Sequence, residues 1–147
     1  QLPNIKIAVT GNGRVANGVL EIMEELGIRR LSVDEYLNKS YEEPCYVQLT
    51  PGDYNKHKEG LKFDLFHFFK KPKDYHCNFN RFCTHTDLLI SAAFWDPKAP
   101  VLFTLDDMKE GDFKIKVIAD ITCDIGGSIP APILVNKFNE RYSAFIP

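Results

Sequence analysis

The stretch IKIAVTGNGRVANG occupies residues 5–18 and decides the fold that this sequence predicts. It starts with alternating β-branched residues, which are typical of a strand, and continues with a glycine-rich run that allows a tight turn. Apolar residues then recur at helical spacing from Arg14 to Leu26, and Gly27 stands where a helix C-cap glycine belongs. The first prediction is therefore a strand, a glycine turn and a helix in immediate succession.

Strands and helices alternate along much of the remaining chain. Further elements are expected as a second strand at Arg30–Val33, a buried strand at Leu88–Ala93, a last core strand at Lys116–Asp120, and a short helix capped by threonine at Thr104–Met108. Such alternation is typical of a parallel sheet covered on both faces. The sequence predicts one α/β domain over residues 1–147, a Rossmann-type doubly wound parallel sheet in three layers, α/β/α.

The middle and the end of the chain are less regular. We interpret residues 40–85 as an irregular or helical insertion after the second strand, because aromatic and charged side chains crowd much of this segment without a clear period. Within it, Tyr46–Leu49 is a candidate short strand and Pro72 a candidate helix start. Residues 128–147 contain several prolines and are expected to form an extended tail.

The composition excludes several classes of protein. Apolar residues make up 44% and charged residues 26% of the 147 residues, as in ordinary globular domains, and the net charge of -2 provides no basic field for nucleic acid or anionic lipid. No apolar run is long enough to span a bilayer, so neither nucleic acid nor a membrane is an expected partner. The four cysteines follow no disulfide pattern, which favours a reducing, cytoplasmic setting.

The glycine turn is a candidate dinucleotide site. Gly11 and Gly13 follow the strand, and a diphosphate can approach backbone closely only where no Cβ obstructs it. Free N–H groups and the positive dipole end of the next helix would face the phosphates. Ala16 fills the third place of the G-x-G-x-x-G/A pattern, and Gly18 would let the helix lie close to the sheet. The alternative is a strand–helix turn that needs glycine for its geometry alone.

A carboxylate follows the second predicted strand. Asp34 stands where dinucleotide-binding domains place the acid that bonds both ribose hydroxyls of the adenosine half. This charge would repel a 2′-phosphate, so the expected cofactor is NAD, with NADP possible. The neighbouring Glu35 adds to the same charge. The alternative is a solvated turn aspartate.

Metal-binding patterns were tested and fail. The run Asp120–Ile129 alternates acidic and polar residues like a calcium loop, but its glycine is one position late and Ala131 stands where a bidentate Glu is required. Zinc ligands of the usual spacing are also not found among the cysteines and histidines. No metal site is predicted, and the side chains considered for zinc are His76, Cys77, Cys83 and His85, while His57 and His67 belong to no pattern.

Several segments resemble one enzyme family. The run Asp120–Ile129 is similar to the signature of lysine–ketoglutarate reductases and the related lysine-forming saccharopine dehydrogenases. The resemblance extends to Leu89–Trp95, Ala99–Thr104, the Gly13–Gly18 form of the dinucleotide turn and the aromatic stretch Phe68–Tyr75. The resemblance thus covers most of the chain.

The resemblance implies an NAD(P)-dependent oxidoreductase. In that family, two Rossmann-like domains surround a cleft and are related to alanine dehydrogenase. The reaction joins or splits lysine and 2-oxoglutarate through an imine that the nicotinamide reduces, so the full-length protein would take a small amino-acid-derived substrate. The family's catalytic lysine and histidine lie in the other domain, which no part of this chain resembles and toward which the 128–147 tail would lead.

The resemblance also assigns residues and leaves alternatives open. No catalytic residue is assigned, and this chain alone is expected to be inactive. The chain reads Ser128-Ile129-Pro130-Ala131 where the reductases continue Ser-Ile-Glu-Phe, so an alanine dehydrogenase-like enzyme or a non-catalytic nucleotide-sensing domain remain alternatives. The implied cofactor contacts are Gly11, Gly13, Arg14 and Val15 at the diphosphate, Asp34 at the ribose, Ala92, Ala93 and Phe94 along the cofactor, and Asp120 with Ile121 beside the nicotinamide half.

Overall fold

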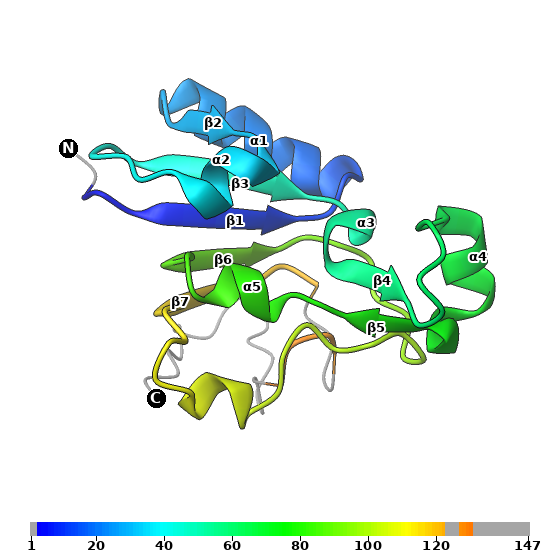
Figure 1. The fold of residues 1–147 in the computed structure, drawn as a ribbon. Helices are drawn as coiled ribbons and strands as arrows, with labels where there is room; N and C mark the ends of the chain where they lie inside the picture. Colours follow the sequence, from blue (N-terminus) through cyan, green and yellow to red (C-terminus); the bar gives the residue numbers. More distant parts are fainter. Residues whose placement is uncertain (1–2, 123–126, 131–147) are drawn as a thin grey trace, which may run out of the picture.

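The computed structural model describes residues 3–122 and 127–130. Its centre is a five-stranded sheet in the order β2-β3-β1-β6-β7, in which every neighbouring pair is parallel (Figure 1). These strands are β1 (Lys6–Thr10), β2 (Arg29–Leu31), β3 (Cys45–Leu49), β6 (Leu88–Ser91) and β7 (Val117–Asp120). The predicted α/β, Rossmann-like fold is confirmed.

Helices and a second, small sheet fill the connections. The α-helices are α1 (Arg14–Glu25), α2 (Val33–Asn38), α3 (Pro51–Tyr54), α4 (Leu65–Lys70) and α5 (Asn80–Cys83). Two 3-10 helices are η1 (Pro72–Asp74) and η2 (Asp107–Lys109), and the small antiparallel sheet pairs β4 (Asn55–His57) with β5 (Tyr75–Cys77). No described helix is long and apolar enough to cross a membrane.

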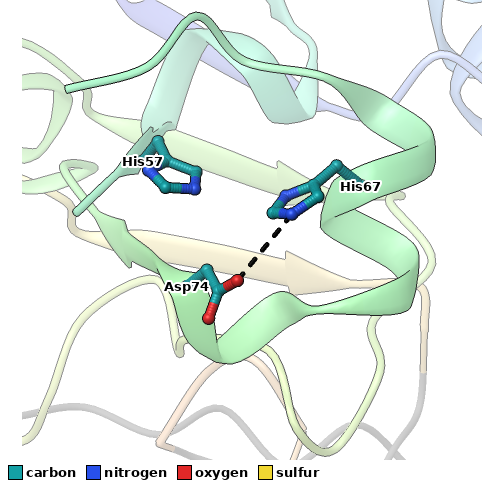
Figure 2. Close-up of side chains that lie close together, drawn as sticks. All are labelled: His57, His67 and Asp74. Atoms are coloured by element: carbon teal, nitrogen blue, oxygen red, sulfur yellow. Dashed lines mark ion pairs between the residues drawn. The ribbon is translucent and has the colours of Figure 1, made fainter. Parts of the chain in front are cut away.

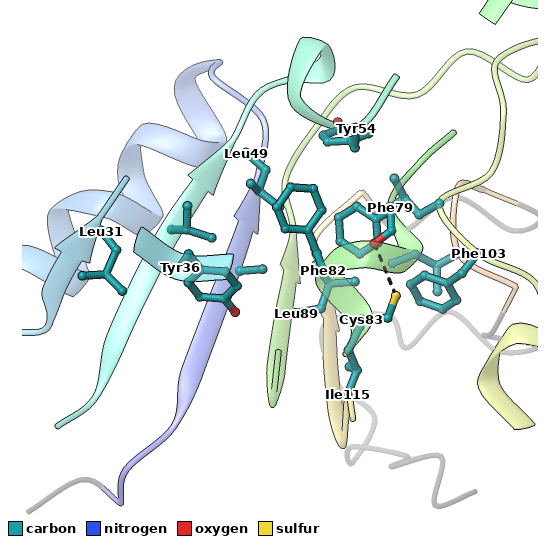
Figure 3. Packing of buried hydrophobic residues seen from close by; sticks show 14 of the residues in the cluster. Leu31, Tyr36, Leu49, Tyr54, Phe79, Phe82, Cys83, Leu89, Phe103 and Ile115 are labelled. Carbon is teal, nitrogen blue, oxygen red and sulfur yellow. Dashed lines mark hydrogen bonds between the residues drawn. The ribbon is translucent and has the colours of Figure 1, made fainter. Parts of the chain in front are cut away.

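Alternate side chains of the strands enter two separate cores, one on each face of the sheet. Ile7 and Val9 of β1 pack on the α1 side with Leu20 and Met23 of that helix. Ala8 between them joins the other core, which α2 and α5 cover. The side chains labelled in Figure 3 belong to this second core and are Leu31, Tyr36, Leu49, Tyr54, Phe79, Phe82, Cys83, Leu89, Phe103 and Ile115. Helices thus lie on both faces, as the three-layer prediction requires.

Helix α1 begins and ends as the sequence predicts. It follows Gly13 and closes with a Schellman motif, in which the N–H of Ile28 donates to the oxygen of Met23 at 3.0 Å and that of Gly27 to Glu24 at 2.9 Å. Gly27 has a φ of 67°, a left-handed conformation that glycine adopts without a steric cost. The C-cap glycine prediction is confirmed.

The position of β3 corrects the sequence interpretation. Cys45–Leu49 is a central strand that lies between β2 and β1, which confirms the candidate strand at Tyr46–Leu49 but not its assignment to an irregular insertion. Four of the five residues of β3 are buried, whereas β2 exposes two of its three. The more apolar strand takes the inner place, because a central parallel strand is covered on both faces.

Reciprocal bonds of the capping-box type precede α2 and η2. Ser32 caps α2, with the N–H of Glu35 donating to its hydroxyl at 3.3 Å, so the second strand ends at Leu31 and not at Val33 as expected. Thr104 and Asp107 exchange the same pair of bonds, as the predicted threonine cap requires, but the helix begins only at Asp107, with Asp106 as its N-cap. The helix that follows is a 3-10 helix.

The β4–β5 sheet, α4 and η1 form a small unit beside the carboxyl ends of the main strands (Figure 1). Pro72 starts η1, as predicted, because the first turn of a helix tolerates the missing N–H. The signature run is described only in part, since residues 123–126 lie outside the described residues, and so does the expected tail beyond residue 130.

Gly18 does not lie close to the sheet, contrary to the expectation from the sequence. A Cβ built on Gly18 would have no heavy atom within 4 Å, so this glycine does not bring α1 close to the sheet. Ala16, two positions earlier in α1, is completely buried and is the small residue that this face of the helix requires.

We therefore expect Gly18→Ala to stabilise the protein by about 0.5–1 kcal/mol, because alanine loses less backbone entropy in a helix interior. Urea unfolding measures the effect. Ala16→Leu is the control and should destabilise by about 1–3 kcal/mol through overpacking. A loss of stability in Gly18→Ala would contradict the open surroundings of this position.

Candidate functional site

A cleft of about 160 Å³ lies at the carboxyl ends of β1, β3 and β6. The segments that follow these strands line it: Thr10–Gly13 after β1, Pro51, Tyr54 and Asn55 after β3, and Ala92–Asp96 after β6. The chain leaves β1 toward the face of α1 and leaves β3 toward the face of α5, so neighbouring strands send their connections to opposite faces. Open α/β sheets bind ligands at such a switch point.

Gly11 joins the three segments. Its N–H donates to the oxygen of Leu49 at 2.8 Å, and its oxygen accepts from Nε2 of Gln48 at 3.0 Å, which ties it to the end of β3. On the other side, a Cβ on Gly11 would lie 2.8 Å from the oxygen of Ala92. With a φ of 104°, this position requires glycine for both space and conformation.

The N-terminus of α1 is left without a side-chain cap. Gly13 is the N-cap residue, and the first turn carries no acidic residue but has Arg14 at its start. A Cβ on Gly13 would meet no atom within 4 Å, so the space in front of the helix is clear of described atoms. Uncapped N–H groups, the helix dipole and a guanidinium together favour an anion at this place. Val15 is exposed in the same turn.

The loop after β6 forms the opposite wall of the cleft. The N–H of Ala92 donates to the oxygen of Thr10 at 3.2 Å, which holds this loop against the end of β1. Ala93 and Phe94 also line the cleft, and the Phe94 ring is 82% exposed. The structure thus brings Gly11, Gly13 and this loop together, as the sequence predicts.

An aromatic wall completes the cleft and was not predicted. Tyr54, Phe68 and Phe69 line it from α3 and α4, and Trp95 lines it from the loop after β6. The sequence signal was the density of aromatic residues in this region, which we interpreted as an insertion with no place relative to the sheet.

Asp120 and Ile121 lie at the same edge of the sheet but do not line the cleft. Asp120 ends β7 opposite Ser91, and the N–H of Ile121 donates to the Ser91 oxygen at 2.9 Å. Oδ1 of Asp120 accepts from the N–H and the hydroxyl of Thr122, at 3.1 and 2.6 Å. In these contacts the carboxylate shapes the turn after β7.

The structure moves Asp34 away from its expected place. It lies exposed in the first turn of α2, where its Oδ1 accepts from Nδ2 of Asn38 at 2.9 Å, and it does not line the cleft. The reason is the strand order, because β3 separates β2 from β1. The acid that follows the strand next to β1 is Asp53, and its Oδ2 accepts from the N–H of Thr50 at 2.6 Å.

Comparison with known proteins supports the sequence resemblance. No protein-family model matches the chain. The chain is similar to alpha-aminoadipic semialdehyde synthase of Arabidopsis thaliana. The two are 33% identical over 86 residues, which cover 55% of this chain and 8% of the relative. This match confirms the predicted resemblance to lysine–ketoglutarate reductases and saccharopine dehydrogenases, and the chain spans less than a tenth of the relative's length.

The described walls of the cleft contain few groups for acid–base chemistry. No lysine, histidine or cysteine is among the described lining residues, and the titratable side chains there are Tyr54 and Asp96. Burial raises the pKa of Tyr54 well above its ordinary value, so its hydroxyl stays neutral at physiological pH. The described cleft walls therefore consist mainly of backbone, small side chains and aromatic rings.

Substitution of Gly11 tests whether the cleft depends on this residue. A residue forced into a left-handed backbone conformation typically costs about 1–3 kcal/mol. We expect Gly11→Ala to lower the free energy of unfolding by more than this, because its Cβ would also clash with the Ala92 backbone. Gly27→Ala is the matched control, since Gly27 has a positive φ but free space around its Cβ. Equal losses in the two variants, measured by urea unfolding, would show that the contact with Ala92 has no energetic weight.

Proposed function

We propose that this chain binds an NAD(P) dinucleotide in the cleft and serves as the cofactor domain of an oxidoreductase. The observation that carries the proposal is the uncapped N-terminus of α1, which opens beside Gly13 at the carboxyl ends of the parallel strands. The similarity to alpha-aminoadipic semialdehyde synthase supports an oxidoreductase-related domain.

The binding mode follows from the residues of the two walls. The diphosphate would accept from the N–H groups of Arg14 and Val15 and pair with the Arg14 guanidinium. The aromatic wall and Ala92 would cover one of the flat rings, which excludes water from it. When bound, the nicotinamide would supply or accept a hydride. Because Asp34 does not line the cleft, we propose NAD or NADP without a preference derived from this carboxylate.

The substrate belongs to the same proposal. By resemblance, the reaction is the reductive joining of lysine and 2-oxoglutarate or its reverse, with Asp120 near the nicotinamide half. Since the described cleft walls hold no lysine or histidine, the acid–base groups would come from another domain. The free thiols of Cys45, Cys77 and Cys83 fit a reducing, cytoplasmic setting.

A second candidate is a nucleotide-sensing domain without catalytic activity. The same lack of acid–base side chains in the cleft favours it. The two proposals differ in whether a second domain is required. An enzyme needs a second domain that closes on the nicotinamide, whereas a sensor needs none.

Substitution of Gly13 separates binding from folding. Gly13→Ala should raise the dissociation constant for NADH at least about tenfold, because its methyl group enters the space of the diphosphate. The backbone at Gly13 has a φ of -86°, which alanine adopts freely, so stability should fall by no more than about 1 kcal/mol. Titration of NADH fluorescence measures binding, and thermal unfolding measures stability.

Gly111→Ala is the control, because Gly111 also has open space around it and does not line the cleft. It should leave NADH binding unchanged. Equal binding in Gly13→Ala and wild-type protein would place the dinucleotide elsewhere.

Turnover distinguishes the domain from a complete enzyme. We expect this chain alone to bind NADH but not to oxidise it with lysine and 2-oxoglutarate, nor to reduce NAD with saccharopine or alanine. Absorbance at the nicotinamide band reports both directions. Measurable turnover would show that the described residues, or those beyond them, hold a complete acid–base apparatus.

A further inference from the structure

Three side chains that no sequence motif connects come together in the small unit. His57 lies on β4, His67 on α4 and Asp74 in η1, and they point toward one another (Figure 2). One possible ligand atom from each side chain lies within 4.8 Å of the other two. Among the described residues, these are the three His, Cys, Asp or Glu side chains that come this close together. His57 is 7% exposed, and the other two are partly buried.

The hydrogen bonds around His67 favour one tautomer. When the hydroxyl of Tyr75 donates to the oxygen of Asp64 at 3.3 Å, its oxygen is left to accept from Nδ1 of His67 at 3.1 Å. The neutral ring then carries its proton on Nδ1 and a lone pair on Nε2. That lone pair faces the carboxylate of Asp74, whose Oδ2 lies 3.8 Å away.

Two of the ligand atoms thus face each other across a gap of a few ångströms, and the third, on the buried His57, lies within 4.8 Å of both. A metal cation placed between them would use all three side chains. Imidazole and carboxylate are ligands that Zn²⁺ and similar cations prefer.

We propose that His57, His67 and Asp74 form a binding site for a divalent transition-metal cation of the Zn²⁺ class. Bond lengths of about 2.0–2.2 Å from a tetrahedral zinc place neighbouring ligand atoms about 3.4 Å apart. The 3.8 Å between Nε2 of His67 and Oδ2 of Asp74 is a few tenths of an ångström longer, so these side chains close by a small rotation. Three protein ligands leave the fourth position to water.

The hydrogen bonds around His67 are those expected of a metal-bound histidine, whereas those around His57 must change when a metal binds. Ligating histidines almost always donate their second N–H to an oxygen, as His67 does to Tyr75. His57 instead accepts at Nδ1 from the N–H of Glu59 at 3.1 Å, so its proton is on Nε2. Coordination through Nε2 moves this proton to Nδ1 and releases the Glu59 N–H, which lies on an exposed residue and can bond to water.

Such a site would brace one wall of the cleft. The cation would join β4, α4 and η1, which are short elements with few backbone hydrogen bonds of their own. Helix α4 also carries Phe68 and Phe69 of the cleft wall. The metal site itself lies outside the cleft lining and does not depend on whether a dinucleotide binds there.

Calorimetry with Zn²⁺ on chelator-treated protein, without dinucleotide, tests the proposal. The expected result is one Zn²⁺ per chain, with an affinity that falls at least about tenfold in each of His57→Gln, His67→Gln and Asp74→Asn. His76→Gln is the matched control, because His76 is an exposed histidine of the neighbouring strand β5 and should leave the affinity unchanged. Circular dichroism verifies that each variant is folded.

A second measurement uses the unmodified chain and so remains valid if a variant fails to fold. Long-range ¹H–¹⁵N NMR should show His67 with its proton on Nδ1 before and after Zn²⁺ is added. His57 should change from an Nε2–H to an Nδ1–H tautomer. Absence of binding, binding that survives all three substitutions, loss of binding in His76→Gln, or rings that do not respond to Zn²⁺ would each overturn the proposal.

Discussion

The backbone of Gly11, directly after β1, lies between the ends of β3 and β6, and the cleft depends on its contacts with both. Its hydrogen bonds to Leu49 and Gln48 tie it to the end of β3, and its missing Cβ lets the backbone of Ala92 approach from β6. The same turn sets the direction in which α1 begins. Three chain segments and one helix end therefore meet at a residue that contributes no side chain.

The strand order determines which side chains reach this cleft. β3 takes the place beside β1 because it is the more apolar strand, and the shorter, more exposed β2 is left at the edge. As a result, Asp34 follows an edge strand and lies on α2, while α3, which follows β3, lines the cleft with Pro51 and Tyr54. In the proposed function, a preference for one dinucleotide over another would depend on α3 and on the aromatic wall.

The small unit has two distinct surfaces that share one helix. One side of α4 supplies rings to the cleft through Phe68 and Phe69, while His67 on the same helix meets His57 and Asp74. Tyr75 connects these regions, because its ring packs against Phe68 and its hydroxyl bonds to His67. A change of charge or ligand at His57 and His67 would therefore alter the position of the aromatic wall through the contacts of Tyr75.

Local sequence determined the elements that depend on neighbours in the chain. The glycine turn, the limits of α1, the cap at Thr104 and the alternation of strands and helices follow from periodicity and from capping bonds over a few residues. The resemblance in Leu89–Trp95 likewise marked a loop that does line the cleft. Tertiary structure alone decided the place of β3, the removal of Asp34 from the cleft and the meeting of His57, His67 and Asp74. These features arise from competition for the buried centre of the sheet and from contacts between distant elements, for which no spacing along the chain provides a signal.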